Sequence, residues 1–400
     1  MTVKLIPLAS SISNPAESAR ISDDVAKRLK PVGIESSQTL TDEAESAEEA
    51  MGNSVLALMV TGGTEHLARA VSRSASSLML LYHDSLNSLP AALEAASALN
   101  VPISRYDDLE TISEYIAASR VHEMLNKTKF LYFGRPSPWL IYSTPSEEDM
   151  KRIGLKVERV DVEEFIDEVK REKVNDDEVK SVMKRSQAVG PDENDFRTSL
   201  KIEKAIRDEL KETGSSSFSI RCFDLLEPLR GTACLALSRL NDEGYTAGCE
   251  GDAPAAISMM ILSGLSGKPS FMGNVARVEG KNVTIAHCTS PTSILSDFKY
   301  MTHFESGMGV GIRGTFEEGQ EMTVLRMNAN LNTIRYGTGR VVSSEWRNDL
   351  CRTQVKISFD GDPSLILKQP IGNHYSLTPG NYSNELVFLA RMIGAKLEKI

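Results

Sequence analysis

The sequence lacks three features that would assign a protein to a class directly. Its longest apolar runs, such as Ser54–Val60 and Ser77–Tyr82, are far shorter than the ~20 residues that cross a bilayer, so no membrane span is predicted. It has no basic excess: 45 Lys and Arg face 55 Asp and Glu, a formal charge of −10. This balance argues against non-specific binding to nucleic acid, because neutralising phosphates needs a positive footprint. Small molecules are therefore the expected partners.

Cysteine is also scarce, with five residues that form neither a paired framework nor a CxxC metal knuckle. We expect reduced and mostly buried thiols. The N-terminal residues carry no basic segment followed by an apolar stretch of signal-peptide length, which favours the cytoplasm. What is present is ordinary globular composition, with 41% apolar and 25% charged residues over 400 positions. That length favours two or three domains.

Residues 1–146 alternate short apolar runs with helical segments, which is typical of a parallel sheet in a doubly wound α/β domain. The strands expected there are Val3–Ala9, Ser54–Val60, Ser77–His83 and Lys129–Gly134. The same alternation through residues 147–267 predicts a second Rossmann-like α/β domain. Beyond residue 267, strand-like stretches separated by Gly, Asn and Asp predict a mostly antiparallel, barrel-like β domain over 268–400. We expect an amphipathic helix, Tyr382–Leu397, to close the chain.

Two carboxylates, Glu250 and Asp252, follow a short apolar strand where a helix begins. Ligands bind at the carboxyl ends of strands in α/β folds, which favours a functional role for Glu250. Asp252 is at least as well explained as the cap of the following helix. Further polar groups follow downstream at Asn274, His287 and His374. Carboxylate, amide and imidazole together suit a divalent cation such as Mn²⁺ or Mg²⁺, although any one histidine is more often structural.

The ordered set Glu250-Gly-Asp252, Ser270-Phe-Met272, Ala286-His287 and His374 resembles the carboxyl-terminal half of the L-fucose isomerase and L-arabinose isomerase superfamily. Segments 61–65, 87–94 and 136–139 resemble the less characterised fucose-isomerase-like proteins, so the resemblance spans most of the chain.

The resemblance implies a metal, usually Mn²⁺, that is held by a Glu, an acidic residue about 24 positions later and a distant His. Glu250 matches the first ligand, which is also an acid/base, and His374 matches the last. The acidic position falls on Asn274, which can donate a carbonyl oxygen but cannot exchange a proton. Either Asp252 or Asp224 replaces the missing carboxylate, or the reaction differs from simple isomerisation.

Four more residues have two readings each. Asp224 either faces the same crevice or caps a turn; His303 either binds sugar hydroxyls or belongs to a turn. His287 resembles the histidine near the arabinose isomerase metal, or it is structural. Trp139 either stacks on a sugar ring or lies in the core. The arginines of the β region could serve a phosphorylated or sulfonated sugar, or be solvated; they are Arg313, Arg326, Arg335 and Arg340.

The leading hypothesis is a metal-dependent aldose–ketose isomerase that acts through an enediol on a pentose, hexose or derivative. The catalytic candidates are Glu250, Asn274 and Asp252, and the metal ligands Glu250, Asn274 and His374. The resemblance also implies a homo-oligomer, a trimer or hexamer. The alternatives are a related epimerase or lyase, because of Asn274, and a non-catalytic sugar-binding module.

Overall fold

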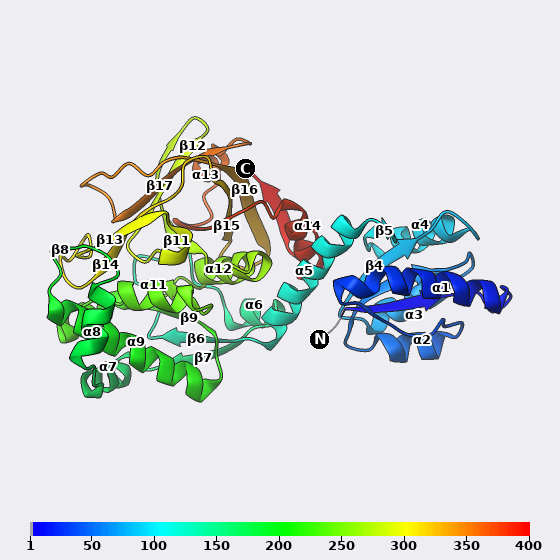
Figure 1. Cartoon of the computed structure of the whole chain (residues 1–400), viewed down its shortest axis with the longest axis horizontal. Coiled ribbons are helices and arrows are strands. Elements are labelled where there is room, and N and C mark those ends of the chain that lie inside the picture. Colours follow the sequence, from blue (N-terminus) through cyan, green and yellow to red (C-terminus); the bar gives the residue numbers. More distant parts are fainter. Residues whose placement is uncertain (1–2) are drawn as a thin grey trace. The chain divides into compact units, whose positions relative to one another are not determined.

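The computed structural model describes residues 3–400 as two compact units, which divide after Arg120 (Figure 1). The first unit is built on five parallel strands in the order β2-β1-β3-β4-β5. Strand β3 is an entirely buried apolar run, as expected for a parallel sheet covered on both faces. Its strands are β1 (Lys4–Leu8), β2 (Glu35–Ser36), β3 (Ser54–Met59), β4 (Ser77–Tyr82) and β5 (Ile103–Arg105). Its helices are α1 (Pro15–Leu29), α2 (Glu43–Ala50), α3 (Glu65–Ser74) and α4 (Ser88–Leu99), and α5 (Leu109–Lys127) leads into the second unit.

The second unit begins with four parallel strands in the order β10-β9-β6-β7. They are β6 (Lys129–Phe133), β7 (Lys156–Val160), β9 (Ser217–Ile220) and β10 (Thr246–Cys249). Side chains of α7 (Val162–Arg171), α9 (Glu193–Thr213) and α11 (Cys234–Asp242) share one apolar core with β6 and β9. The other helices are α6 (Glu147–Arg152), α8 (Asp176–Met183), α10 (Leu226–Leu229) and α12 (Ala253–Ser266).

Strand β6 lies in this second sheet, whereas the sequence assigned Lys129–Gly134 to the first domain. Its neighbours β7 and β9 come later in the chain, and an apolar run alone does not reveal which sheet will accept it. The three-domain division at residues 146 and 267 stays a prediction.

Six antiparallel strands then close into a barrel, in the order β15-β18-β11-β12-β17-β16, because β16 also pairs with β15. The strands are β11 (Phe271–Glu279), β12 (Asn282–His287), β15 (Glu321–Met327), β16 (Thr333–Ser343), β17 (Thr353–Phe359) and β18 (His374–Pro379). Three strands, β8 (Ala188–Val189), β13 (Asp297–Met301) and β14 (Gly311–Thr315), form a separate small sheet. The predicted combination of parallel α/β sheets and a barrel-like C-terminal sheet is confirmed.

The chain ends differently from the prediction. Short helix α13 (Leu365–Lys368) precedes β18, and the predicted terminal helix stops early as α14 (Ser383–Met392). Gly394, at φ +66°, interrupts it, and β19 (Lys396–Lys399) then joins β16 in parallel. Glycine adopts such positive φ values without the steric cost of a side chain. The tail is therefore a helix followed by a strand that extends the barrel sheet.

Helix α12 connects the second sheet to the barrel. It follows β10 directly and contacts β10 as well as β15 and β18 of the barrel. This packing brings the end of β10 and the start of β18 close together, although they are more than 120 residues apart in sequence.

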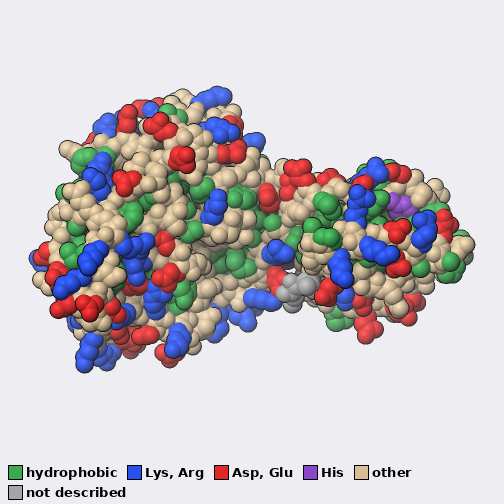
Figure 2. Space-filling view, viewed as in Figure 1, with side chains coloured by type: hydrophobic (Ala, Val, Ile, Leu, Met, Phe, Trp, Pro, Cys, Tyr) green, Lys and Arg blue, Asp and Glu red, His purple; other side chains and the backbone are tan. Residues whose placement is uncertain are grey.

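The surface and the cysteines agree with the composition. Basic and acidic side chains are interspersed on the face seen in Figure 2. All five cysteines are free thiols, and only Cys351 is not buried. Within residues 3–400, no helix combines the length and apolar character that crossing a membrane requires.

Candidate active site

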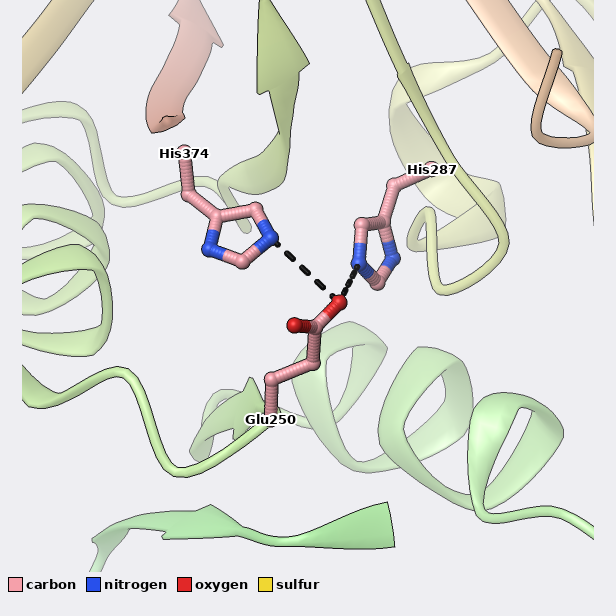
Figure 3. A group of neighbouring side chains, drawn as sticks. All are labelled: Glu250, His287 and His374. Carbon is pink, nitrogen blue, oxygen red and sulfur yellow. Dashed lines mark ion pairs between the residues drawn. The ribbon is translucent and has the colours of Figure 1, made fainter. Parts of the chain in front are cut away.

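Three side chains from three separate elements meet at the junction of the second sheet and the barrel (Figure 3). Glu250 directly follows β10, His287 is the last residue of β12, and His374 is the first residue of β18. All three are buried, with 8%, 5% and 0% of their surfaces exposed. The ligand atoms they offer lie within 4.8 Å of one another.

One carboxylate oxygen faces both imidazoles. Glu250 Oε1 lies 3.6 Å from His287 Nε2 and 3.5 Å from His374 Nε2, and Figure 3 shows both rings turned toward it. Nε2 of His374 is buried and has no hydrogen-bond partner within the described residues. A buried nitrogen without a partner is costly, because it has lost its hydration. The three side chains therefore form a polar pocket that is incomplete by itself.

The backbone at Glu250 is held in an unusual conformation. Glu250 has φ +60° and Gly251 has φ +71°. A left-handed conformation costs a residue with a side chain roughly 1–2 kcal/mol, and such strain concentrates at functional sites. At Gly251, an added Cβ would lie 2.7 Å from Cα of Pro136. The close approach to Pro136 thus requires glycine beside the strained Glu250.

Asp252 fixes the orientation of the His374 ring through the ring nitrogen that does not face Glu250. Its Oδ2 lies 2.9 Å from Nδ1 of His374, so Nε2 is directed toward Glu250. Asp252 also caps α12 by accepting a 2.9 Å hydrogen bond from the amide of Ala255. Asp252 is therefore the cap of α12 and also a contact of His374, while its functional role stays a prediction.

Arg326 is the partner that balances the buried charge of Asp252. Its Nη1 donates to both carboxylate oxygens, at 2.9 and 3.0 Å, and its Nη2 donates to Ser143 Oγ at 2.7 Å. Both charged side chains are fully buried. Sequence analysis considered Arg326 only for sugar binding or as a solvated residue. Its place among six consecutive buried residues of β15 becomes apparent only in the structure.

The electrostatics of the site follow from these contacts. Burial alone would raise the pKa of Glu250, but the nearby imidazoles of His287 and His374 outweigh burial and hold the pKa well below its usual range. Burial lowers the pKa of His374, yet the carboxylates of Asp252 and Glu250 raise it to about 9. For Asp252, burial is outweighed first by Arg326, and the pKa is lowered. The carboxylates of Glu250 and Asp252 and the imidazole of His374 thus favour one another's charged forms.

An aromatic wall borders Glu250. Trp139 Nε1 donates a 2.7 Å hydrogen bond to Glu250 Oε2, while 51% of the Trp139 surface stays exposed. Phe223 packs edge-on against Trp139 and against His303, with ring centroids 4.8 and 5.7 Å apart. Burial lowers the pKa of His303 to about 4, which keeps this imidazole neutral. Trp139 therefore lies outside the core and beside the carboxylate of Glu250.

The remaining candidates lie around the cluster or away from it. Asn274 is directly opposite His374 in the β11–β18 pair, but its Oδ1 accepts a 2.8 Å hydrogen bond from Asn373. Asp224 lies 3.0 Å from Arg221 Nε and lines a different cleft. Sequence analysis did not single out Glu305. Burial, and then the charge of Glu250, raises the pKa of Glu305, so a second carboxylate is influenced by the site.

The cluster fits a divalent cation. One carboxylate and two imidazoles are suitable donors for first-row transition metals, and a metal would satisfy the partnerless Nε2 of His374. Asp252 contacts Nδ1 of His374. Metal-bound histidines are commonly oriented by a carboxylate that binds their other ring nitrogen in this way. His287 joins Glu250 and His374 in this set. Asn274, the third ligand expected from the sequence, stays a prediction, and its Oδ1 accepts the hydrogen bond from Asn373.

Comparisons with known proteins find similarity to sugar isomerases. Residues 147–266 match the model of the L-arabinose isomerase central domain. A sulfoquinovose isomerase of Clostridium sp. (strain MSTE9) is 24% identical over 216 residues, which are 50% of this chain and 47% of the relative. A sulfoquinovose isomerase of Alkalicoccus urumqiensis is 30% identical over 115 residues, which are 28% of this chain and 26% of the relative.

The chain thus spans about half the length of the first relative and about a quarter of the second. The match to the L-arabinose isomerase central domain covers α6 through α12, and it includes β10 and Glu250, which follows that strand. The predicted resemblance is confirmed: at modest identity, parts of this chain are similar to an L-arabinose isomerase domain and to sulfoquinovose isomerases.

Proposed function

We propose that this protein is a metal-dependent aldose–ketose sugar isomerase that works at Glu250, His287 and His374. The observation that carries the proposal is the buried, partnerless Nε2 of His374 aimed at a carboxylate shared with a second imidazole. The similarity to isomerases supports the same reaction class. Mn²⁺ is the first cation to test, on the family resemblance and the mixed oxygen and nitrogen donors.

Isomerisation moves a proton between two neighbouring carbons, one of which is alpha to the carbonyl. A divalent cation held by the three side chains would stabilise the negative charge of the enediolate. Glu250 is the group we assign to proton transfer, because Oε2 is held by Trp139 while Oε1 faces the histidines. The exposed face of Trp139 offers the sugar an aromatic surface beside that oxygen.

A second proton-transfer group is needed where the family has an acidic residue and this chain has Asn274. Asp252 is unsuited, because Arg326 and His374 occupy its oxygens. Glu305 is the residue we propose for this role. Its raised pKa makes it a better general acid near neutrality than an ordinary glutamate.

The names of the relatives suggest the first substrate, a hexose that bears a sulfonate. We propose incubating the Mn²⁺-loaded protein in D₂O with sulfonated, phosphorylated and neutral aldoses, and following products by NMR. The expected result is a ketose and deuterium exchange alpha to the carbonyl. Glu250→Gln should retain the fold and lose both.

Three other outcomes would redirect the proposal. An epimer without a ketose would favour an epimerase, and a cleaved product would favour a lyase, both alternatives raised by Asn274. Thermal stabilisation by sugar without any product or exchange would favour a binding module. Oligomer formation, as a trimer or hexamer, and a cytoplasmic location stay proposals as well.

A further inference from the structure

A second cleft, of about 640 Å³, opens at the carboxyl ends of three strands of the second sheet. It is lined by residues that follow or end β6, β7 and β9, among them Arg135, Arg159 and Arg221. Carboxyl ends of parallel strands are where ligands bind in open α/β sheets. Three arginines thus line this cleft, although the chain as a whole carries a charge of −10.

The two carboxylates of the cleft already have other partners. Asp161 caps α7 and accepts from the amides of Glu163 and Glu164, at 2.9 and 3.2 Å. Asp224 forms an ion pair with Arg221. Two negative charges thus stand against three positive ones, and one cationic group remains in excess.

Arg135 and Arg159 are the cations available to a ligand. Arg135 is exposed and has no hydrogen-bond or ion-pair partner for its guanidinium within residues 3–400. Arg159 lies over the ring of Tyr132, 4.9 Å from its centroid, and has only a long 3.5 Å contact with exposed Glu147. Guanidinium groups bind oxyanions with two parallel hydrogen bonds, so this pair is suited to a sulfonate or a phosphate.

The arginines considered from the sequence all lie outside the second sheet. Arg326 is bound to Asp252, Arg335 donates to Glu398 at 2.8 Å, and Arg340 donates to the carbonyl of Gly319 at 3.1 Å. Arg313, in β14, lies 4.6 Å from the ring centroid of Trp346. Arginines at the carboxyl ends of the strands of the second sheet are therefore better placed than those of the barrel to bind an acidic sugar.

The cleft lies beside the Glu250 cluster in the order of the strands. Glu250 follows β10, Arg221 follows β9, and Arg135 follows β6. Because these strands are neighbours in that order, the three residues lie in a row at the carboxyl end of the sheet. Adjacent strands are about 4.8 Å apart, which places the ends of β10 and β6 on the order of 10 Å from each other. That separation is within reach of one extended hexose and its terminal substituent together with an arginine side chain.

One short segment also connects the two places physically. It begins at Arg135 in the cleft, and the amide of Ser137 donates a 2.9 Å hydrogen bond to the carbonyl of Glu250. It ends at Trp139, which donates to the Glu250 carboxylate. A ligand held at Arg135 therefore contacts the same segment that orients the reacting carboxylate.

We propose that this cleft, with Arg135 and Arg159 as its binding groups, holds the anionic substituent of the substrate, a sulfonate or a phosphate ester. The inference rests on the proposed function for the identity of the reacting sugar. It adds that the enzyme distinguishes acidic from neutral sugars by residues of the second sheet, outside the metal cluster.

The test uses Arg135→Gln and Arg159→Gln in the full-length, metal-loaded protein. Arg171→Gln is the matched control, because Arg171 is an exposed arginine at the far end of α7 and its loss changes the net charge equally. The first readout is calorimetric binding of inorganic sulfate and inorganic phosphate. The second is KM for a 6-sulfonated aldohexose, an aldohexose 6-phosphate and the neutral aldohexose.

Loss of one charge-assisted bond should weaken anion binding, and raise KM for the acidic sugar, by about tenfold to hundredfold. The neutral sugar should keep its kcat/KM, and Arg171→Gln should behave as the wild type. The acidic sugar with the lower KM identifies the substituent as sulfonate or phosphate.

Equal anion affinity in Arg135→Gln, Arg159→Gln and Arg171→Gln would overturn the proposal. So would an equal rise of KM for the neutral and acidic sugars. If the wild type turned over no sugar at all, the proposed function would fail, and the calorimetric comparison would still decide whether the cleft binds anions.

Discussion

Nδ1 of His374 lies 2.9 Å from Oδ2 of Asp252, and the same carboxylate is bound by the guanidinium of Arg326. This contact ties a residue of the barrel to the N-terminus of α12. It fixes which nitrogen of His374 faces Glu250. The candidate metal site is thus organised by a buried ion pair that does not itself reach the metal position.

Asp252→Asn should damage both stability and metal binding. It removes the charge that balances Arg326, and breaking a buried pair typically costs 3–5 kcal/mol in the free energy of unfolding. It also weakens the orientation of His374, for which about 10- to 100-fold in metal affinity is expected. Denaturant unfolding and metal titration measure the two effects. An unchanged metal affinity in the folded variant would mean that Asp252 is only structural.

Trp139→Phe should reduce turnover while leaving the protein folded. The change removes the hydrogen bond to Glu250 Oε2 but keeps an aromatic ring at a position that is half exposed. A bond to a charged acceptor is worth about 1.5–3 kcal/mol, so kcat/KM should fall at least about tenfold. Steady-state kinetics and a melting curve test this together. Wild-type kcat/KM would show that Trp139 does not position Glu250.

Gly251→Ala should disturb the segment that holds Trp139. Its Cβ would meet the backbone of Pro136, and its φ of +71° is strained for alanine. Gly280→Ala is the matched control, with φ +61° and no atom within 4 Å of the added Cβ. Both variants should lose about 1–2 kcal/mol of stability from strain, and Gly251→Ala should lose more and also lose activity. Equal losses of stability in the two variants would contradict the close approach of Gly251 to Pro136.

Glu209, which lies in α9 outside the candidate site, should make the free energy of unfolding depend on pH. Burial, and then neighbouring Glu168, raises the pKa of Glu209 to about 7. Because the folded-state pKa lies above the unfolded value, its stabilising contribution is present below about pH 4.5 and is lost as pH rises through 7.

Glu209→Gln should therefore raise the melting temperature relative to the wild type at pH 8, with a smaller difference at pH 5. Glu318→Gln, a change at an exposed turn residue, controls for the loss of one negative charge. A difference that does not vary with pH would show that Glu209 ionises normally.

The fold class could be predicted because apolar runs and turn residues report local structure directly. The runs of β3 and β4 were read with almost their observed bounds. The sheet that β6 joins could not be read, since partners are set by long-range packing. The end of α14 was missed because Gly394 was treated as part of an amphipathic pattern.

The site was predictable only in part. Glu250 and His374 came from the order of motifs, and their proximity is a product of α12 packing between sheet and barrel. Arg326 carried no distinctive signal, because an arginine in a strand looks the same whether it meets solvent or a buried aspartate. The sequence likewise does not indicate a role for Arg135. Its place in the cleft depends on the pairing of β6, which precedes it, with β9 in the second sheet.

The most direct test of the central claim is calorimetric titration of the metal-free protein with Mn²⁺. Our account predicts one site per chain with a Kd in the micromolar range or below, lost in Glu250→Gln and in His374→Gln. Asp224→Asn, which removes a carboxylate outside the cluster, should bind as the wild type does. The account would be contradicted if the wild type bound no divalent cation, or if Glu250→Gln bound it as well as the wild type.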